Sequence, residues 1–393
     1  MTTGRLRGFQ GKIHLDKHIL TSKLYPMSIT CELEKEYAVY KPLNIVKVSC
    51  CVDSGKVTVL IPAYNEAASI CDTILSLQNQ TVKIHKIIVI DDVSTDETAE
   101  AAASLGVTVI RPPKNTGSKA GAQNFGLKFV DTEFTMAIDA DTTLAPDAIE
   151  KLLSAFDNPK VAAACGFVIP RHVETIWERG RYVEYLFAFS FFKPIQDFFN
   201  KPMISSGCFS LYRTKVLKEN SGWQLRTLAE DMDLTWSYYA KGYEVKFIPE
   251  AVCFPIEPHN FLFLRKQLKR WSHGFIQNVR LHWDEIRKIE YLNLMVTVAL
   301  WDAVVASIFY LLLLPVLSIL FMNPYFLLGY VIDVPAVLVP TFYAAFKRKE
   351  ALNLLISLPA FFVIRAVNSI FMLEAIWSEM IMRRTFKVYE KGH

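Results

Sequence analysis

Between residues 57 and 156, short apolar runs alternate with longer stretches in which apolar residues recur every three or four positions. The short runs predict buried strands at residues 57–61, 87–90, 107–110 and 134–138. The longer stretches predict helices at residues 66–78, 96–105, 119–129 and 146–156. Strands that alternate with helices are typical of an α/β domain, in which helices cover both faces of a mostly parallel sheet.

Three long apolar segments follow at residues 303–322, 325–346 and 352–376. Each is long enough to span a bilayer, and Trp301, Tyr325 and Trp377 lie near the segment ends, where aromatic anchors are common. We therefore expect a helical membrane region with two to three spans. The alternative is a very apolar helical core in a soluble protein.

Charged residues constrain how these segments are arranged. Lys347-Arg348-Lys349, between the second and third segments, predicts a cytoplasmic loop on the same side as the α/β domain. Three spans would then place Arg383 and Arg384 outside, against the positive-inside tendency. The third segment also contains a proline and two charges: Pro359, Arg365 and Glu374. It could therefore cross the membrane, re-enter it or lie in the interface.

Two opposite charges fall at matching depth if that loop joins two antiparallel helices. Asp333 and Arg365 would each lie about 20 Å from the cytoplasmic helix ends, at about 1.5 Å per residue. An isolated charge in the bilayer is costly, so we expect the two side chains to face each other or a shared watery cavity. A re-entrant third segment would break this register.

The whole chain of 393 residues is long enough for about two domains. We divide it into an N-terminal extension of unknown role (1–54), the α/β domain (55–258), an amphipathic interface region (259–290) and the membrane region with a short basic tail (291–393). Residues 39–52 could form one or two strands. The N-terminus has basic residues but no apolar run of signal-peptide length, so we expect neither cleavage nor export.

Composition narrows the classes of partner. Hydrophobic residues make up 52% of the chain and aromatic residues 13%, which is rich for a soluble protein. A net charge of +4 is too small to indicate a nucleic-acid partner, and the basic residues gather beside apolar segments, which favours anionic lipid head groups or phosphate. The seven cysteines contain no Cys-x-x-Cys pair, so neither a disulfide framework nor a zinc site is indicated.

Polar clusters follow three of the predicted strands: Pro62-Ala-Tyr-Asn-Glu66, Asp91-Asp92-Val-Ser-Thr-Asp96 and Asp139-Ala-Asp141. In sheets of this type, ligands bind beyond the carboxyl ends of the strands. Ser94 and Asp96 could instead cap the following helix, and Asp91 and Asp92 could cap a turn.

Asp139 and Asp141 are harder to explain by capping. Carboxylates two residues apart at a strand end point the same way, which is comfortable only with a cation or a proton. Mg²⁺ or Mn²⁺, held by the two carboxylates and a diphosphate, would supply the cation that they need. Because neither a Gly-x-Gly-x-x-Gly nor a phosphate-loop motif occurs, the pattern favours a metal-bound nucleotide over a dinucleotide or an ATPase site.

Gln267, Arg270 and Trp271 are spaced so that they share one face of a helix. A guanidinium can bind two phosphate oxygens, and an indole offers a flat apolar surface to a sugar ring. A basic helix that precedes apolar segments could also be a simple interfacial helix with snorkelling Lys and Arg side chains.

The motifs together resemble the membrane-bound family 2 glycosyltransferases, which include cellulose, chitin, hyaluronan and poly-N-acetylglucosamine synthases. Besides the clusters above, the matches are Asn115-Thr-Gly-Ser-Lys-Ala-Gly-Ala-Gln-Asn124, Ser206-Gly-Cys-Phe-Ser-Leu-Tyr-Arg213, Ala229-Glu-Asp231 and Gln267-x-x-Arg270-Trp271. They occur in the family's order and cover residues 56–275. The resemblance implies an inverting enzyme whose catalytic domain has the GT-A fold, an α/β Rossmann-like fold.

The resemblance also implies roles for single residues. The nucleotide sugar would be bound by Pro62, Tyr64, Glu66, Asp92, Lys119, Asp139, Gln267 and Arg270. Asp139 and Asp141 would hold the metal, Asp231 would be the catalytic base with Glu230 beside it, and Trp271 would form the floor of the acceptor site. Ala229 departs from the family, which usually has Thr there, and we recognise no C-terminal gating loop of the cellulose synthase type.

The chemistry of the reaction agrees with a base at Asp231. Inverting transfer to a hydroxyl needs one carboxylate to take the proton while a metal stabilises the leaving diphosphate. The sequence contains both carboxylate sites. Acids at a helix start could also simply complement the helix dipole.

We therefore expect a multi-pass integral membrane glycosyltransferase with a cytoplasmic catalytic domain, which uses a nucleotide sugar, a UDP-sugar by preference, and forms a β-linkage on a carbohydrate or lipid acceptor. The leading interpretation is a processive polysaccharide synthase. The alternative is transfer of a single sugar to a lipid or protein. A catalytically inactive scaffold would require the loss of a key acid, and all of these acids are present. Whether the protein forms a homo-oligomer is left open. The aromatic run at residues 182–199 is expected at the surface near the membrane.

Overall fold

The computed structural model describes residues 55–331 and 334–386. The strands expected within residues 39–52, and Asp333 of the expected Asp333–Arg365 pair, lie outside the described residues. Arg365 lies inside them. Its guanidinium donates a hydrogen bond of 3.0 Å to the Tyr310 hydroxyl and lies over that ring, 4.5 Å from the centroid.

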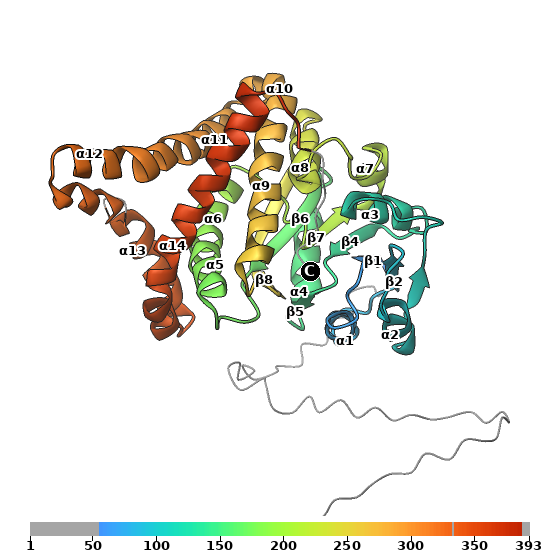
Figure 1. The fold of residues 1–393 in the computed structure, drawn as a ribbon. Helices are drawn as coiled ribbons and strands as arrows, with labels where there is room; N and C mark the ends of the chain where they lie inside the picture. The colour runs from blue at the N-terminus through green and yellow to red at the C-terminus, as the bar shows by residue number, and fades with distance from the viewer. Residues whose placement is uncertain (1–54, 332–333, 387–393) are drawn as a thin grey trace, which may run out of the picture. The chain divides into compact units, whose positions relative to one another are not determined.

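Within the described residues, eight strands form one sheet in the order β3-β2-β1-β4-β7-β6-β8-β5 (Figure 1). The strands are β1 (Val57–Ala63), β2 (Lys86–Asp91), β3 (Thr108–Ile110), β4 (Phe134–Ile138), β5 (Thr142–Leu144), β6 (Val161–Val168), β7 (Phe209–Arg213) and β8 (Glu244–Pro255). Strands β1 to β4 are parallel, whereas β7 runs antiparallel between β4 and β6. The four strands expected from the sequence are confirmed, and they form the parallel half.

Helices follow or connect the strands of this domain. They are α1 (Ile70–Gln78), α2 (Thr98–Ser104), α3 (Lys119–Leu127), α4 (Ala148–Leu153), α5 (Ile176–Phe187), α6 (Lys193–Phe198), α7 (Thr214–Glu219) and α8 (Glu230–Ala240). Helix α1 begins four residues later than expected. The backbone before it is held by the loop after β2, because Glu66 N donates to Thr98 Oγ1 over 2.7 Å and Ala67 N donates to Asp96 Oδ2 over 3.1 Å.

Residues of the strands enter separate cores on the two faces of the sheet, and in β1 they alternate between them. In β1, Val57, Val59 and Ile61 join a cluster that includes residues of α1, α4 and α5. Leu60 points to the other face and joins residues of α3, α8 and the later helix α9. Coverage on both faces is what the continuous apolar character of these strands predicts.

Helix α9 (Phe261–Leu281) carries Gln267, Arg270 and Trp271, so all three lie on one helix as expected. The Asn260 side chain caps its start by accepting a 2.9 Å hydrogen bond from Phe263 N. Near its other end, Asn278 Nδ2 donates to Ala229 O and Gln277 Oε1 accepts from Leu228 N, over 3.1 and 3.0 Å. These bonds fix α9 against the segment that leads into Glu230 and Asp231.

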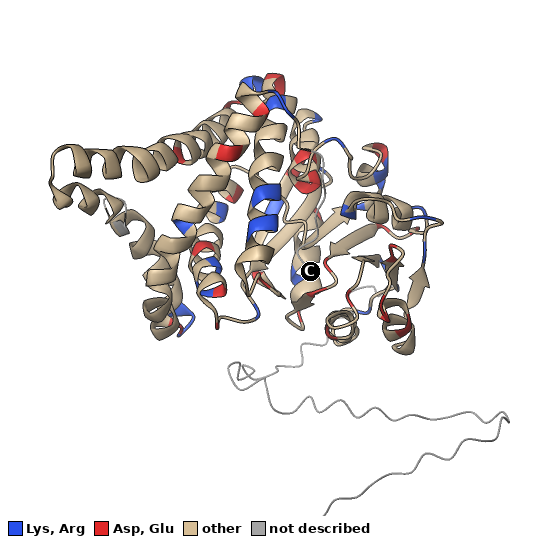
Figure 2. Cartoon of the chain, viewed as in Figure 1, with Lys and Arg blue, Asp and Glu red and all other residues tan. Residues whose placement is uncertain are grey.

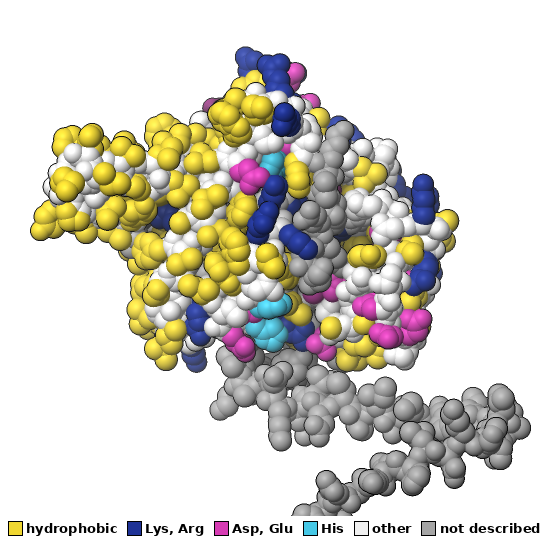
Figure 3. All heavy atoms as spheres, in the orientation of Figure 1, with side chains coloured by type: hydrophobic (Ala, Val, Ile, Leu, Met, Phe, Trp, Pro, Cys, Tyr) yellow, Lys and Arg dark blue, Asp and Glu magenta, His cyan; other side chains and the backbone are white. Residues whose placement is uncertain are grey.

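The remaining helices form the apolar part of the chain. They are α10 (Trp283–Lys288), α11 (Glu290–Trp301), α12 (Leu314–Leu320), α13 (Val334–Lys347) and α14 (Ala351–Ile376), with π-helical segments at Asp302–Ala306, Phe309–Leu313 and Trp377–Ile381. Figure 2 shows few charged residues along α11 and α12, and Figure 3 shows apolar side chains over their surface.

Two continuous helices, Glu290–Leu320 and Ala351–Ile381, are long and apolar enough to cross a membrane. They contain the first and third segments expected from the sequence. The second segment corresponds to a pair of helices, Pro324–Val331 and Pro335–Lys347, which is bent by 42° and counts as one further span if it crosses as a unit. The described residues therefore hold two to three candidate spans.

The aromatic run at residues 182–199 is divided between the core and the surface. Tyr182 and Phe189 are buried, whereas Phe198 is 81% exposed. Phe199 stacks on Tyr291, at the beginning of α11, with 4.1 Å between ring centroids. The exposed end of the run therefore lies next to the first candidate span.

Gly274 allows the close approach of α9 to the segment before α8. A Cβ atom at this position would lie 2.7 Å from Ala229 Cβ and 2.8 Å from Ala229 N.

We predict that Gly274→Val destabilises the protein by about 1–3 kcal/mol, because the added methyl groups push against backbone. Its melting temperature in detergent should fall. Arg265→Ala, at an exposed position of the same helix, should change stability by less than about 0.5 kcal/mol. A Gly274→Val protein as stable as its parent would contradict this packing.

Candidate active site

The loops after β1 and β2 bind each other. Asn65 has a positive φ of 55°, and its backbone N donates to Ser94 Oγ over 3.0 Å. In return, Asn65 Oδ1 accepts from Thr95 N over 2.8 Å. Tyr64 is 37% exposed beside this turn, whereas Glu66 is buried. The structure thus brings two of the expected nucleotide-binding clusters together at the carboxyl edge of the sheet.

The two neighbouring aspartates after β2 have different partners. Asp91 is fully buried at the end of β2, is ion-paired with Arg111 and accepts from Ser94 N over 3.0 Å. Asp92 accepts from both the backbone N and the hydroxyl of Thr116, each over 2.8 Å. Asp91 therefore stabilises the turn, and Asp92 anchors the loop that leads into α3.

Lys119 connects the two carboxylate sites. It is the first residue of α3, whose N-cap Ser118 accepts from Gly121 N over 3.1 Å. The Lys119 ammonium forms an ion pair with Asp139 and donates to the Gly207 carbonyl oxygen over 2.9 Å. Gly207 N in turn donates to Asp231 Oδ2 over 2.8 Å.

Gly207 allows the Asp231 carboxylate to approach the backbone closely. A Cβ atom there would lie 2.6 Å from Asp231 Oδ2. The other oxygen, Asp231 Oδ1, accepts from Met232 N over 2.9 Å at the start of α8. The Asp231 carboxylate is therefore fixed by two backbone N–H groups. The loop that holds it also contacts the lysine paired with Asp139.

Asp139 and Asp141 lie at the end of β4, separated by the buried Ala140. Both aspartates are partly exposed. Within the described part of the chain, no group of three or more His, Cys, Asp or Glu side chains is arranged to hold a metal. The two carboxylates fit the type of Mg²⁺ or Mn²⁺ site in which substrate phosphates and water supply the remaining ligands.

Glu230 is buried at the first position of α8. Burial raises the pKa of its carboxyl above the ordinary value, and the charge of Asp231 raises it further. The positive charges of Lys119 and Arg270 lower the pKa of Glu230 and so oppose this shift. The Arg270 guanidinium therefore interacts electrostatically with the same site. Burial therefore favours the protonated form of Glu230.

Gln267 and Trp271 border a buried polar cluster formed with α5 and the segment after β8. Gln267 Nε2 lies 3.5 Å from Glu257 Oε2, which also accepts from Arg181 Nε over 3.3 Å. The Arg181 guanidinium lies over the Trp271 ring, 4.6 Å from its centroid, and over the Tyr185 ring at 4.5 Å. One face of the expected sugar platform is therefore occupied by a cation.

Arg181 is held by further partners on its own helix. It pairs with Glu184 over 2.5 Å and donates to the Tyr185 hydroxyl over 2.8 Å. Burial alone would lower the pKa of the guanidinium, but Tyr185, Glu184 and Glu257 together raise it above its ordinary value. Arg181 thus remains charged and fixed beneath Trp271.

The structure brings Lys119, Asp139, Glu230, Asp231 and Arg270 into one electrostatic group. Arg181 and Glu257 were not expected from the sequence. Arg181 is a cation within an aromatic helix, which is the one signal that could have marked it. Glu257 follows β8, a strand that the sequence pattern does not predict.

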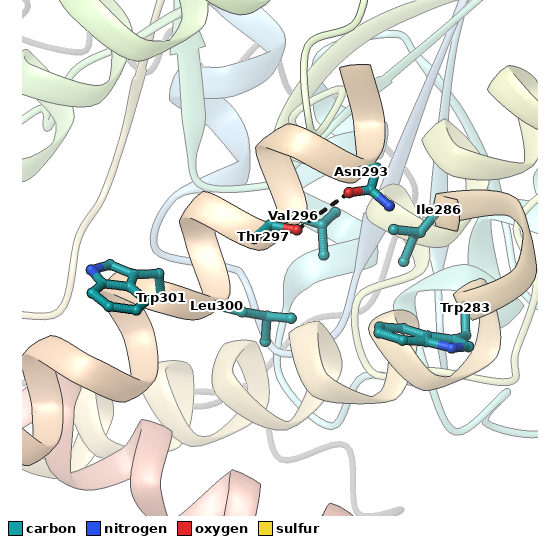
Figure 4. Close-up of a pocket in the computed structure, with 7 residues that line it drawn as sticks. All are labelled: Trp283, Ile286, Asn293, Val296, Thr297, Leu300 and Trp301. Carbon is teal, nitrogen blue, oxygen red and sulfur yellow. Dashed lines mark hydrogen bonds between the residues drawn. The ribbon is translucent and has the colours of Figure 1, made fainter. Parts of the chain in front are cut away.

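A separate hollow of about 330 Å³ lies between α10 and α11. Figure 4 shows its mostly apolar walls, with a hydrogen bond between Thr297 and Asn293. It is lined by Trp283, Ile286, Asn293, Val296, Thr297, Leu300 and Trp301. Because none of the expected site residues lines it, this hollow is not part of the candidate active site.

Known proteins are similar in sequence and in fold to parts of this chain. Residues 58–221 match the family model for glycosyl transferase family 2. A poly-beta-1,6-N-acetyl-D-glucosamine synthase of Staphylococcus epidermidis is 30% identical over 223 residues, which are 56% of this chain and 54% of that protein. A synthase of the same name from Staphylococcus aureus is 29% identical over the same shares of the two chains. The chain thus spans about half the length of these curated relatives.

A solved structure resembles a larger part of the chain. It is a mannosyltransferase from Pyrobaculum calidifontis, in complex with GDP-Man and Mn²⁺. The match has a TM-score of 0.57 and 17% identity, and covers 85% of this chain and 89% of that one. At this identity the likeness concerns the fold. Together, the family match over residues 58–221 and this likeness show that this part of the chain has the GT-A fold.

Proposed function

We propose that this chain is an inverting glycosyltransferase that moves a sugar from a nucleotide sugar to an acceptor hydroxyl at the membrane, with a β-linkage. The observation that carries the proposal is the position of Lys119 between Asp139 and the loop that holds Asp231. One short set of contacts thus connects the acid pair suited to a metal with the acid suited to be the base.

Each residue then has a distinct task. Asp139 and Asp141 would hold Mg²⁺ or Mn²⁺, which stabilises the negative charge of the leaving diphosphate. Arg270 and Lys119 add positive charge on the same side. Asp231 takes the proton from the acceptor hydroxyl, because its oxygens are fixed by Gly207 N and Met232 N and the Gly207 loop is bound to Lys119, the partner of Asp139.

Different observations support the proposed donor and the proposed metal. We propose that Tyr64, Glu66 and Asp92, which follow β1 and β2, bind the nucleoside and that the donor is a UDP-sugar. The curated relatives are named as N-acetylglucosamine polymer synthases, which supports this choice. The Mn²⁺ of the Pyrobaculum calidifontis structure belongs to a protein of the same fold and is consistent with a divalent metal here.

A processive synthase is our leading proposal for the product. The complete Gln267-x-x-Arg270-Trp271 motif and the names of the relatives support it. The small number of candidate spans in the described residues favours the alternative, transfer of a single sugar to a lipid or protein acceptor. Purified protein with labelled UDP-sugars and Mn²⁺ separates the two, because a ladder of products indicates polymerisation and a single addition indicates the alternative.

We also propose that the catalytic domain is cytoplasmic. The basic turn Lys347-Arg348-Lys349 contacts this domain, since the Arg348 guanidinium lies 4.9 Å from the centroid of the Phe167 ring. Tyr182 in α5 donates to Glu350 over 2.8 Å directly after the turn. The positive-inside tendency then places the turn and the domain together on the cytoplasmic side.

Asp141→Asn tests the metal pair. The variant should lose transfer and nucleotide-sugar hydrolysis while it keeps its melting temperature, because one metal-binding charge is removed at an exposed strand end. The Asp147→Asn variant, which changes a partly exposed surface aspartate paired with Lys151, is the control and should retain activity. Parent enzyme that turns over at full rate in EDTA would contradict a metal at this site.

Asp231→Asn tests the base. Transfer should be blocked, whereas UDP and metal binding measured by calorimetry should change little, since proton removal is needed only in the chemical step. Asp284→Asn, at an exposed helix start, serves as the control. An equal loss of UDP affinity and turnover would instead assign Asp231 to the donor site.

Trp271→Ala tests the acceptor platform. The variant should raise the KM for the acceptor much more than the KM for the donor, because ring contact with a sugar is lost while Arg270 remains. Trp177 packs in the same apolar cluster as Trp271 and is the matched control. Trp177→Ala should lower stability without a selective effect on the acceptor. The same selective change in both variants would indicate that Trp271 acts through packing alone.

A further inference from the structure

Helix α8 carries the proposed base Asp231 as its second residue, yet it begins without a side-chain cap. Its N-cap residue is Ala229, whose methyl group cannot accept a hydrogen bond. A Ser, Thr, Asn or Asp at this position would accept from a backbone N–H of the first helical turn and so fix the start of the helix. The start of α8, and with it the Asp231 carboxylate, therefore depends on contacts from other parts of the chain.

These contacts come from one face of α9, which lies beside α8 (Figure 1). Gly274, Gln277 and Asn278 are three or four positions apart and share this face. Gly274 has no side chain and so admits Ala229, whose Cβ would lie 2.7 Å from a Cβ at position 274. Asn278 Nδ2 donates to Ala229 O over 3.1 Å and to Thr227 Oγ1 over 3.2 Å. Helix α9 thus binds the segment that leads into α8.

The buried Gln277 amide uses both of its ends. Its Oε1 accepts from Leu228 N over 3.0 Å, three residues before Asp231. Its Nε2 donates to Glu379 Oε1 and to Phe386 O, each over 2.8 Å. A reversed amide would place a donor against the Leu228 N–H and an acceptor against the Glu379 carboxylate. Glu379 therefore determines which way the Gln277 amide points.

Glu379 is itself fixed in one orientation. It is fully buried in the π-helical segment Trp377–Ile381. Besides Gln277, its Oε1 contacts His273 Nδ1 over 3.0 Å, and its Oε2 lies 3.4 Å from Arg280 Nη1. Because a buried carboxylate is stable only when it is paired and hydrogen-bonded, these partners keep Glu379 in place. The Gln277 amide is thereby held against a fixed group.

We infer that Gln277 is a positioning residue for the proposed base. Oriented by Glu379, it holds the Leu228 backbone and so determines where α8 presents the Asp231 carboxylate. Asp231 is then fixed from two sides, because Gly207 N binds its Oδ2 and α9 holds the backbone that precedes it. The inference rests on the proposed function, since Gln277 acts on the reaction only through Asp231. Its loss should slow the chemical step without weakening donor binding.

Matched substitutions of Gln277 and His273 test this role. Gln277→Met keeps an unbranched side chain but removes the hydrogen bonds to Glu379 and Leu228 N. His273→Met, one turn earlier, also removes a partner of Glu379 but leaves Leu228 N bound to Gln277. Both variants should melt at a lower temperature in detergent, because a buried carboxylate loses a partner.

Only Gln277→Met should lower the kcat of sugar transfer, by about 10- to 100-fold, because the base is misplaced. The KM for the donor, and the Kd for UDP measured by calorimetry, should remain close to those of the parent in both variants. Gln277→Asn is a milder second variant, because its shorter side chain cannot reach Leu228 N and Glu379 together. It should show the same selective loss of kcat.

Amide hydrogen exchange measures the positioning without reference to activity. The Leu228 N–H is protected by its bond to Gln277 Oε1, so residues 227–232 should exchange faster in Gln277→Met than in the parent. In His273→Met they should exchange at the parent rate. Exchange in α2, on the other side of the sheet's parallel half, should be equal in all of these proteins and so report any general loosening.

Three results would overturn the inference. A parent-like kcat in the Gln277 variants would show that the base does not need this contact. An equal loss of kcat in Gln277→Met and His273→Met would show that both act through stability alone. Unchanged exchange of residues 227–232 in Gln277→Met would show that Gln277 does not fix the start of α8. A parent protein that transfers no sugar would instead contradict the proposed function, and the exchange measurement would still decide the role of Gln277.

Discussion

The contact of Lys119 with both Asp139 and Gly207 is the interaction on which the site depends. The ends of β4 and α8 each present carboxylates, and like charges close together repel one another unless a cation or a proton lies between them. Lys119 supplies the cation and, through Gly207, fixes the loop that orients Asp231. Burial and the nearby charge of Asp231 also raise the pKa of Glu230, which favours its neutral form. The carboxylates can therefore lie close together at this edge of the sheet.

The sequence predicted the parallel half of the sheet because its signals are local. In β1 to β4, each strand is a short apolar run, and its polar cluster follows directly in the chain. The other half of the sheet, in which β6 and β8 are parallel and β7 and β5 antiparallel to their neighbours, was not predicted because its partners are distant in sequence. For example, β5 has three residues and pairs with the end of β8, with Thr142 opposite Pro255. The same distinction applies to the site. Helical spacing placed Gln267, Arg270 and Trp271 on one face, but the contact of Arg181 with Trp271 arises from the packing of α5 on α9 and leaves no pattern in either segment.

The hydropathy of the last helices correctly predicted that they are long and apolar. It did not predict which helices they pack against. Ala351–Ile381 and Glu290–Leu320 both have spanning length, yet the first buries charged and polar groups such as Glu379 against α9. The doubts raised by Arg365 and Glu374 in the sequence are explained by contacts with Tyr310 and Lys269. Such contacts depend on which helices become neighbours, and a profile along one segment does not contain that information.

A continuous series of contacts leads from α14 to the acceptor side of the site. Asn368 binds Glu184, Glu184 pairs with Arg181, and the Arg181 guanidinium rests on the ring of Trp271. At Gly180 no side chain separates α5 from α14, so the two backbones are in direct contact one residue before Arg181. The position of the Trp271 indole is thereby connected to the packing of α14 on α5.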